Sequence, residues 1–81
     1  MPRALTVYSR SDCHLCEEMI AGLQDLQARF VFELRVVDVD ADPDLVRRLG
    51  EHVPVLMDGK RELCRHRLQP ASLAAYLAKM P

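Results

Sequence analysis

No apolar run in the 81-residue chain approaches the roughly 18 consecutive residues that suggest a membrane-spanning helix. The opening segment, Met1–Tyr8, lacks the long apolar stretch and the small-residue cleavage site of a signal peptide. Neither sign dominates the charge, because eleven basic residues stand against twelve acidic ones. Nothing therefore draws the whole chain toward nucleic acid or an anionic membrane, and we expect a cytoplasmic protein without such partners.

The length of the chain leaves room for one small core. We expect a single domain over residues 1–81, with no internal repeat, low-complexity tract or linker. Hydrophobic residues make up 49% of the chain and charged residues 28%, a globular balance that excludes disorder. A domain of this size has no space for a large cofactor cavity, and we expect it to be a monomer.

Cysteine is scarce and odd in number, with residues Cys13, Cys16 and Cys64. An odd count fits poorly with the paired disulfide framework of a small secreted protein. In a reducing compartment the close pair Cys13 and Cys16 instead indicates catalysis or metal binding. The cysteines therefore carry most of the functional argument.

Hydrophobic periodicity predicts seven elements in the order β-α-β-α-β-β-α. Alternation marks the strands, apolar residues at steps of three and four mark the helices, and proline, glycine and aspartate mark the ends. The expected strands cover 5–8, 32–37, 53–57 and a segment ending at about 65, and the expected helices cover 13–30, 43–49 and 70–80.

The connections between these elements predict the topology. A strand–helix–strand start implies parallel pairing with a right-handed crossover, and the Asp58-Gly59 turn adds an antiparallel strand. Ser11 or Asp12 is expected to cap the first helix. The fold class is therefore α/β, with a four-stranded mixed sheet flanked by helices in the thioredoxin-like arrangement.

The motif Cys13-His14-Leu15-Cys16 follows a predicted strand and opens a predicted helix. Unpaired amides and the dipole at a helix N-terminus stabilise the thiolate, the reactive form of cysteine. We expect Cys13 to be exposed beside those amides and Cys16 to be shielded on the apolar face, as dithiol exchange requires. The alternative is two small core residues near a helix start, and the strand–turn–helix placement favours the redox interpretation.

Four segments, 5–9, 13–16, 53–56 and 58–59, together resemble the glutaredoxin-like branch of the thioredoxin superfamily. The resemblance spans essentially the whole chain. It implies a cis peptide bond between Val53 and Pro54 that faces the cysteines, with the Val53 backbone pairing with a substrate segment. Disulfide-containing proteins or small thiol compounds are the substrates that such a site implies.

Departures from that family bear on the electron donor. Familiar members carry proline and an aromatic residue where this chain has His14 and Leu15, and a glycine pair where it has residues 64–67. Bulk in place of glycine argues against a snug glutathione groove, although Arg65 and Arg67 would suit the carboxylates of glutathione. The reductant stays open between glutathione and a protein reductase, with a slight preference for the protein.

Basic residues near the motif are further candidates. A cationic His14 would stabilise a nearby thiolate, and Arg10 would act in the same way, the alternative for both being plain solvation. Arg65 and Arg67 belong to a locally basic hairpin that either docks an anionic substrate or acidic partner, or protects a sheet edge. No aromatic residues interleave with these charges, which disfavours nucleic acid.

Two apparent metal motifs do not fit their metals. Strand alternation would place Cys64 and His66 on one face, but with Cys13 and Cys16 they lack the standard second half of a zinc site. The alternating aspartates of 38–44 are interrupted by proline where a calcium loop needs glycine. No metal is expected.

The sequence therefore predicts a small thiol-disulfide oxidoreductase in which Cys13 attacks a substrate disulfide and Cys16 resolves the mixed disulfide. Its redox equivalents would be carried by the two sulfurs, with no metal or organic cofactor. The alternative is a non-catalytic thioredoxin-fold binding module, or a metal carrier, that uses the same cysteine pair.

Overall fold

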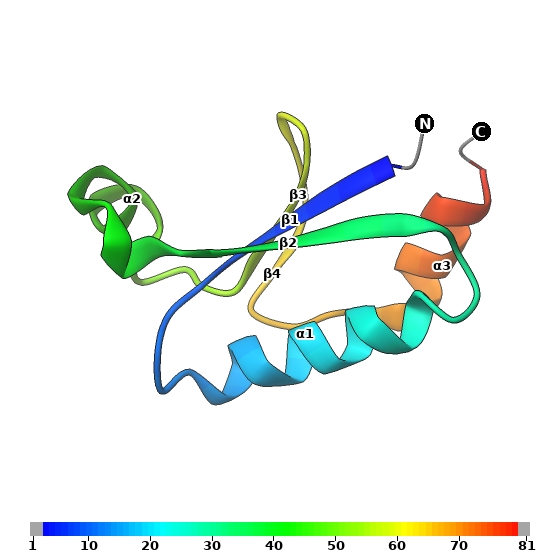
Figure 1. The fold of residues 1–81 in the computed structure, drawn as a ribbon, viewed down its shortest axis with the longest axis horizontal. Helices are drawn as coiled ribbons and strands as arrows, with labels where there is room; N and C mark the ends of the chain where they lie inside the picture. The colour runs from blue at the N-terminus through cyan, green and yellow to red at the C-terminus, as the bar shows by residue number, and fades with distance from the viewer. Residues whose placement is uncertain (1–2, 80–81) are drawn as a thin grey trace.

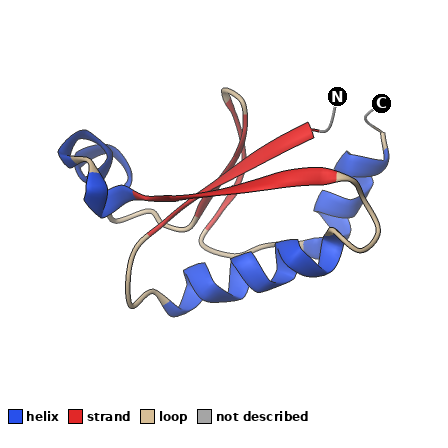
Figure 2. Ribbon diagram, in the orientation of Figure 1, coloured by secondary structure: helices blue, strands red, loops and turns tan. Residues whose placement is uncertain are grey.

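The computed structural model describes residues 3–79 and forms a four-stranded mixed sheet with three α-helices (Figures 1 and 2). The strand order is β2-β1-β3-β4, in which β1 is parallel to β2 and antiparallel to β3, and β3 is antiparallel to β4. The predicted fold class and element order are confirmed. The strands are β1 Arg3–Ser9, β2 Phe32–Asp38, β3 Val55–Asp58 and β4 Arg61–Arg65; the helices are α1 His14–Leu26, a 3₁₀ turn Val39–Ala41, α2 Pro43–Leu49 and α3 Pro70–Ala78.

The helices are distributed unequally around the sheet. Helices α1 and α3 lie side by side along one side of the sheet, whereas α2 lies at the end that β2 reaches (Figure 1). Helix α2 contributes no buried side chain, so the core is made by the sheet with α1 and α3. The buried members of this core are Leu5, Val7, Met19, Leu23, Leu26, Phe32, Leu56, Leu73 and Leu77.

One row of paired residues crosses all four strands. Val7 pairs with Val36 on β2 and with Leu56 on β3, and Leu56 pairs with Cys64 on β4. Val7 and Leu56 are fully buried, Cys64 is half-buried, and Val36 is 52% exposed. Burial is therefore concentrated on the two inner strands and falls toward both edges of the sheet.

Helix α1 begins one residue later than its sequence suggests. Cys13 is the N-cap residue, and its Sγ accepts a hydrogen bond of 3.2 Å from the backbone amide of Cys16. The prediction of Ser11 or Asp12 as the cap is wrong. Asp12 takes a left-handed conformation (φ 56°), and the next residue, Cys13, stands at the N-terminal end of the helix.

The other end of α1 also differs from expectation. The helix stops at Leu26 rather than continuing to Phe30. The Gln27 side-chain amide donates to the Phe32 carbonyl (3.1 Å), and the Phe30 amide donates to the Leu26 carbonyl (2.9 Å). These bonds turn the chain directly into β2, and Phe30 packs on the core from the turn.

The β3–β4 hairpin carries an extra residue on β4. Leu56 pairs with Cys64 but the next residue, Met57, pairs with Glu62, so Leu63 has no partner in the ladder. As a result Leu63 and Cys64 both pack against the core, although they are adjacent. The prediction that Cys64 and His66 share a strand face is wrong, because β4 ends at Arg65 and His66 takes a left-handed conformation (φ 68°).

Helix α3 contacts the β3–β4 hairpin through Tyr76. The helix starts at Pro70 as predicted. Its expected end at residue 80 lies outside the described residues. The Tyr76 hydroxyl donates a 2.6 Å hydrogen bond to Asp58 Oδ2, which raises the pKa of Tyr76. The guanidinium groups of Arg3 and Arg61 lie 5.7 and 5.2 Å from the centre of its ring.

We expect Tyr76→Phe to lower the free energy of unfolding by about 1.5 kcal/mol, because it removes a hydrogen bond to a charged acceptor. Urea unfolding measures the change. Tyr8→Phe is the matched control, since the Tyr8 hydroxyl has no hydrogen bond within residues 3–79. Equal effects of the two substitutions would contradict the proposed fastening of α3.

Candidate functional site

Cys13 and Cys16 are joined by a disulfide across the first turn of α1, with their Cα atoms 5.2 Å apart. Cys16 lies on the buried face of the helix and is 2% exposed, as predicted. Cys13 is half-buried, less exposed than its position before the helix suggested. Only one sulfur of the pair is therefore open to a partner.

The start of α1 provides an electrostatic environment for Cys13. Its Sγ already accepts the Cys16 amide as the helix cap, at a place where the helix dipole favours negative charge. A thiolate formed there accepts the same amide more strongly than a neutral thiol does. The helix start therefore favours a negative charge on Cys13 Sγ.

The sheet brings a second loop to the same end. Strand β1 runs toward the cysteine motif, and antiparallel β3 starts beside it, since Tyr8 pairs with Val55. The Val53-Pro54 peptide bond just before β3 is cis, Pro54 is fully buried, and the Pro54 carbonyl accepts a 2.8 Å hydrogen bond from the His66 amide. The loop is thereby held from both β3 and the end of β4.

His14 extends from the first turn of α1 into solvent. Its side chain is 82% exposed, and Nε2 lies 3.5 Å from Glu18 Oε1 one turn further along the helix. The partner that the structure gives His14 is therefore a carboxylate rather than a sulfur. A charged His14 would be offset by Glu18, which weakens any effect on Cys13.

The two arginines predicted to dock an anionic group have different surroundings. Arg65 makes a two-pronged ion pair with Glu62 (2.8 and 2.6 Å), which raises the pKa of Arg65 and lowers that of Glu62. Arg67 makes no ion pair within the described part of the chain. It lines a hollow of about 210 Å³ together with Leu15 and Glu18 of α1. Arg67 is thus the one of the two that lies beside the cysteine-bearing helix without an ion pair among residues 3–79, in a hollow that Glu18 also lines.

The pairing of Arg65 was hidden from sequence reasoning. Residues three apart on a regular strand point to opposite faces, so Glu62 and Arg65 would not meet. The extra residue Leu63 shifts the alternation and lets them meet on one side. The Glu62–Arg65 ion pair could have been predicted only if the bulge at Leu63 had been known.

Arg10 follows β1 and precedes the cysteine motif, but its guanidinium is directed to other segments. It makes two hydrogen bonds to the Asp40 carboxylate and one to the Gly50 carbonyl. Asp38 and Asp42 cap the 3₁₀ turn and α2 through the amides of Asp40 and Asp44. The alternating aspartates therefore have capping and ion-pair partners, and among residues 3–79 no three His, Cys, Asp or Glu side chains gather as metal ligands would.

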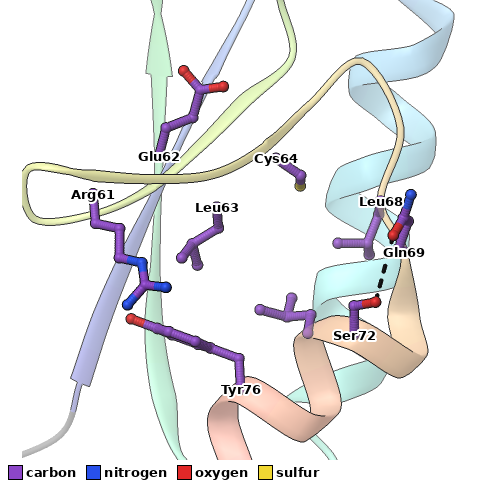
Figure 3. A pocket seen from close by; sticks show the side chains of 9 residues that line it. Arg61, Glu62, Leu63, Cys64, Leu68, Gln69, Ser72 and Tyr76 are labelled. Atoms are coloured by element: carbon purple, nitrogen blue, oxygen red, sulfur yellow. Dashed lines mark hydrogen bonds between the residues drawn. The ribbon is translucent and has the colours of Figure 1, made fainter.

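The third cysteine lines a separate pocket of about 190 Å³ between β4 and α3 (Figure 3). Leu63, Leu68 and Tyr76 line the same pocket as Cys64, and neither Cys13 nor Cys16 belongs to the lining. Burial, and to a lesser degree the charge of Glu62, raises the pKa of the Cys64 thiol. This environment therefore favours the protonated thiol of Cys64, in a pocket that the Cys13–Cys16 pair does not line.

We expect Cys64 in the oxidised protein to react slowly with iodoacetamide at pH 7, because the thiolate is the reactive form. The alkylation rate of Cys64 should still rise above about pH 8.5, where the rate of an ordinary cysteine begins to level off. The same protein unfolded in urea, with the Cys13–Cys16 disulfide intact, is the control. A folded-state profile that levels off with the unfolded one would contradict this expectation.

None of the described helices has the length and apolarity needed to cross a membrane.

A family model described as Glutaredoxin-like domain (DUF836) matches residues 4–78. No protein of curated function matches the chain.

The solved structures similar to this one include the following three. Protein Ne2328 from Nitrosomonas europaea is 46% identical, with 95% of this chain and 93% of that chain covered and a TM-score of 0.80. Target protein XcR50 from X. campestris is 36% identical, with 95% and 99% covered and a TM-score of 0.77. Thioredoxin 1 from Thermosipho africanus, at 20% identity, 93% and 94% coverage and a TM-score of 0.62, shares the fold.

Proposed function

This chain belongs to the Glutaredoxin-like domain (DUF836) family, and from that premise we propose that it is a thiol-disulfide oxidoreductase acting on protein or low-molecular-weight disulfides. The fold and the Cys13–Cys16 pair support a thiol redox role. The observation that carries the proposal is the asymmetry of the pair: a half-buried sulfur at the helix cap is bonded to a fully buried one. Dithiol exchange needs this division between attacking and resolving sulfurs.

The reaction follows from the two sulfurs. The Cys13 thiolate attacks one sulfur of a substrate disulfide, forming a mixed disulfide and releasing the other substrate sulfur, which takes up a proton. The Cys16 thiol then loses its proton and attacks Cys13 Sγ, closing the internal disulfide and releasing the second substrate thiol. The substrate gains two electrons and two protons: the protein supplies both electrons and the Cys16 proton, and the solvent supplies the second proton, because Cys13 reacts as a thiolate.

The loop at Val53 and Pro54 is the proposed platform for the substrate. Val53 precedes β3 and is not part of the described β ladder, so its backbone groups are available to an extended segment beside Cys13. Arg67 is the proposed site for an anionic group of that partner, because it makes no ion pair among the described residues. We assign Arg65 a smaller part, since Glu62 occupies its guanidinium.

A protein reductase is the proposed electron donor in a reducing cytoplasm. Side chains at residues 64–67 occupy the stretch where familiar glutaredoxins have a glycine pair, and bulk there disfavours close approach of the glutathione backbone. The Arg65–Glu62 pair also removes one of the two arginines that would hold glutathione carboxylates. These features support the protein over glutathione as reductant.

The test measures turnover of a peptide disulfide with NADPH and one reducing system at a time, either glutathione with glutathione reductase or thioredoxin reductase alone. Equilibration with glutathione buffers gives the reduction potential in parallel. Turnover with thioredoxin reductase only is the expected result. Rapid glutathione-driven turnover that is lost in Arg67→Ala would reverse the choice of donor. If the pair forms no reversible disulfide, the oxidoreductase proposal fails in favour of a binding module.

A further inference from the structure

A single guanidinium joins three segments that are distant in the sequence. Arg10 Nη2 lies 2.8 Å from Asp40 Oδ1 and Nε lies 3.2 Å from Asp40 Oδ2, while Nη1 donates to the Gly50 carbonyl at 3.1 Å. Asp40 belongs to the 3₁₀ turn after β2, and Gly50 caps the C-terminus of α2. Each of the three guanidinium nitrogens of Arg10 therefore donates a hydrogen bond.

Two of these segments carry the proposed redox site. Arg10 is three residues before Cys13, and Gly50 is three residues before Val53. Pro54, after Val53, is held by burial and by the His66 amide, but α2 before Gly50 has no buried side chain, so packing does little to hold the helix end of the segment that leads to Val53. Polar contacts at its ends therefore carry more of that task than they would in a packed helix.

Gly50 permits this contact because it has no side chain. The residue is buried, and a Cβ there would lie 2.6 Å from the Val46 carbonyl oxygen and 3.2 Å from Arg10 Nη1. A side chain at this position would push against both the helix backbone and the arginine. The absence of a side chain lets the guanidinium approach the carbonyl directly.

We infer that Arg10 is a positioning residue that holds the segment leading to Val53 and Pro54 in register with Cys13, and so sets how a substrate segment meets the attacking sulfur. The inference rests on the proposed oxidoreductase function. It assigns Arg10 a different role from direct stabilisation of a thiolate. The charge of Arg10 is offset by the bidentate carboxylate of Asp40, which leaves little net field for Cys13.

The two roles predict opposite effects when Asp40 is removed. If Arg10 acts by position, Asp40→Ala weakens the fork and slows disulfide exchange, as Arg10→Gln does. If Arg10 acts through its charge, Asp40→Ala leaves that charge uncompensated and speeds the reactions of Cys13. Arg10→Lys keeps the charge and loses the fork, so it separates the roles a second time.

The experiment uses the full chain carrying Cys64→Ser, with Arg10→Gln, Arg10→Lys and Asp40→Ala as test variants. Arg35→Gln, in the exposed Glu33 pair, is the matched control. Two rates are measured for each: kcat/KM for a peptide disulfide, and alkylation of the reduced protein by iodoacetamide across pH. Iodoacetamide is small and needs no contact with the Val53 loop, so it reports on Cys13 alone. Thermal unfolding gives the stability of each variant.

We expect all three test variants to lose about tenfold in kcat/KM, because small misplacements of a reacting group are costly, while the alkylation rate and its pH midpoint stay within about twofold of the parent. Faster alkylation in Asp40→Ala, or full exchange in Arg10→Lys, would overturn the positioning role. A drop in thermal stability with exchange rates equal to those of Arg35→Gln would also overturn it. A parent protein that exchanges no disulfide at all would refute the proposed function together with the inference.

Discussion

Cys13→Ser is expected to abolish disulfide exchange, whereas Cys16→Ser should leave the protein covalently attached to its substrate. Cys13 is the partly exposed sulfur at the cap of α1, and without it no mixed disulfide forms. Cys16 is buried and is bonded to Cys13. Its loss therefore stops the reaction after the first step and traps the mixed disulfide.

Mass spectrometry of the intact protein, after incubation of the reduced variants with a peptide disulfide, measures the trapped adduct. Cys64→Ser is the control, and it should exchange at the rate of the unsubstituted protein because Cys64 lines a different pocket. Adducts that accumulate in Cys13→Ser but not in Cys16→Ser would reverse the assignment of attacking and resolving sulfurs.

Leu56→Ala is expected to lower the free energy of unfolding by about 3 kcal/mol, the range typical of a buried leucine that leaves a cavity. Leu56 is fully buried on inner strand β3, between Val7 and Cys64. A chain of this length has a total stability of roughly 4–12 kcal/mol, so the loss is a large part of the whole. The variant should therefore stay mostly folded in water but unfold at a clearly lower urea concentration than the parent protein.

Val36→Ala is the matched control for Leu56→Ala, because it removes methyl groups from the exposed end of the same row. Its effect should stay within about 0.5 kcal/mol, as for most surface substitutions. Urea unfolding followed by circular dichroism measures both variants. Similar losses in the two would show that burial is not concentrated on the inner strands.

Local patterns in the sequence predicted most of the fold. Strand alternation and the Asp42-Pro43 helix start depend on neighbouring residues, and both appear in the structure. The hairpin predicted at Asp58-Gly59 also forms, but its turn is Gly59–Lys60, because Asp58 is the last residue of β3 and pairs with Arg61. The burial of Cys16 was predictable for the same reason, since helical spacing alone places it on the apolar face. The proposed platform at Val53 required the resemblance to glutaredoxins as well.

Features that depend on distant or irregular contacts were not predictable. Arg10 meets Asp40 across thirty positions of sequence, and no local pattern specifies that contact. The Arg65–Glu62 pair depends on the bulge at Leu63, which breaks the alternation on which strand reasoning relies. The helix cap was predicted wrongly because N-cap propensity favours Ser11 or Asp12. In the structure Asp12 has a left-handed backbone and Cys13 is the N-cap, with its sulfur as the acceptor.

The pairing of Tyr8 with Val55 has a consequence for how this chain tolerates change over evolution. The cysteine motif follows Tyr8 by a few residues, and the Val53-Pro54 loop comes just before Val55, the residue that pairs with Tyr8. An insertion on either side of that pair would separate the halves of the site directly. The Gly59–Lys60 turn and the stretch 27–31 lie outside these connections, so length variation among descendants should accumulate there while the spacing at the site is kept.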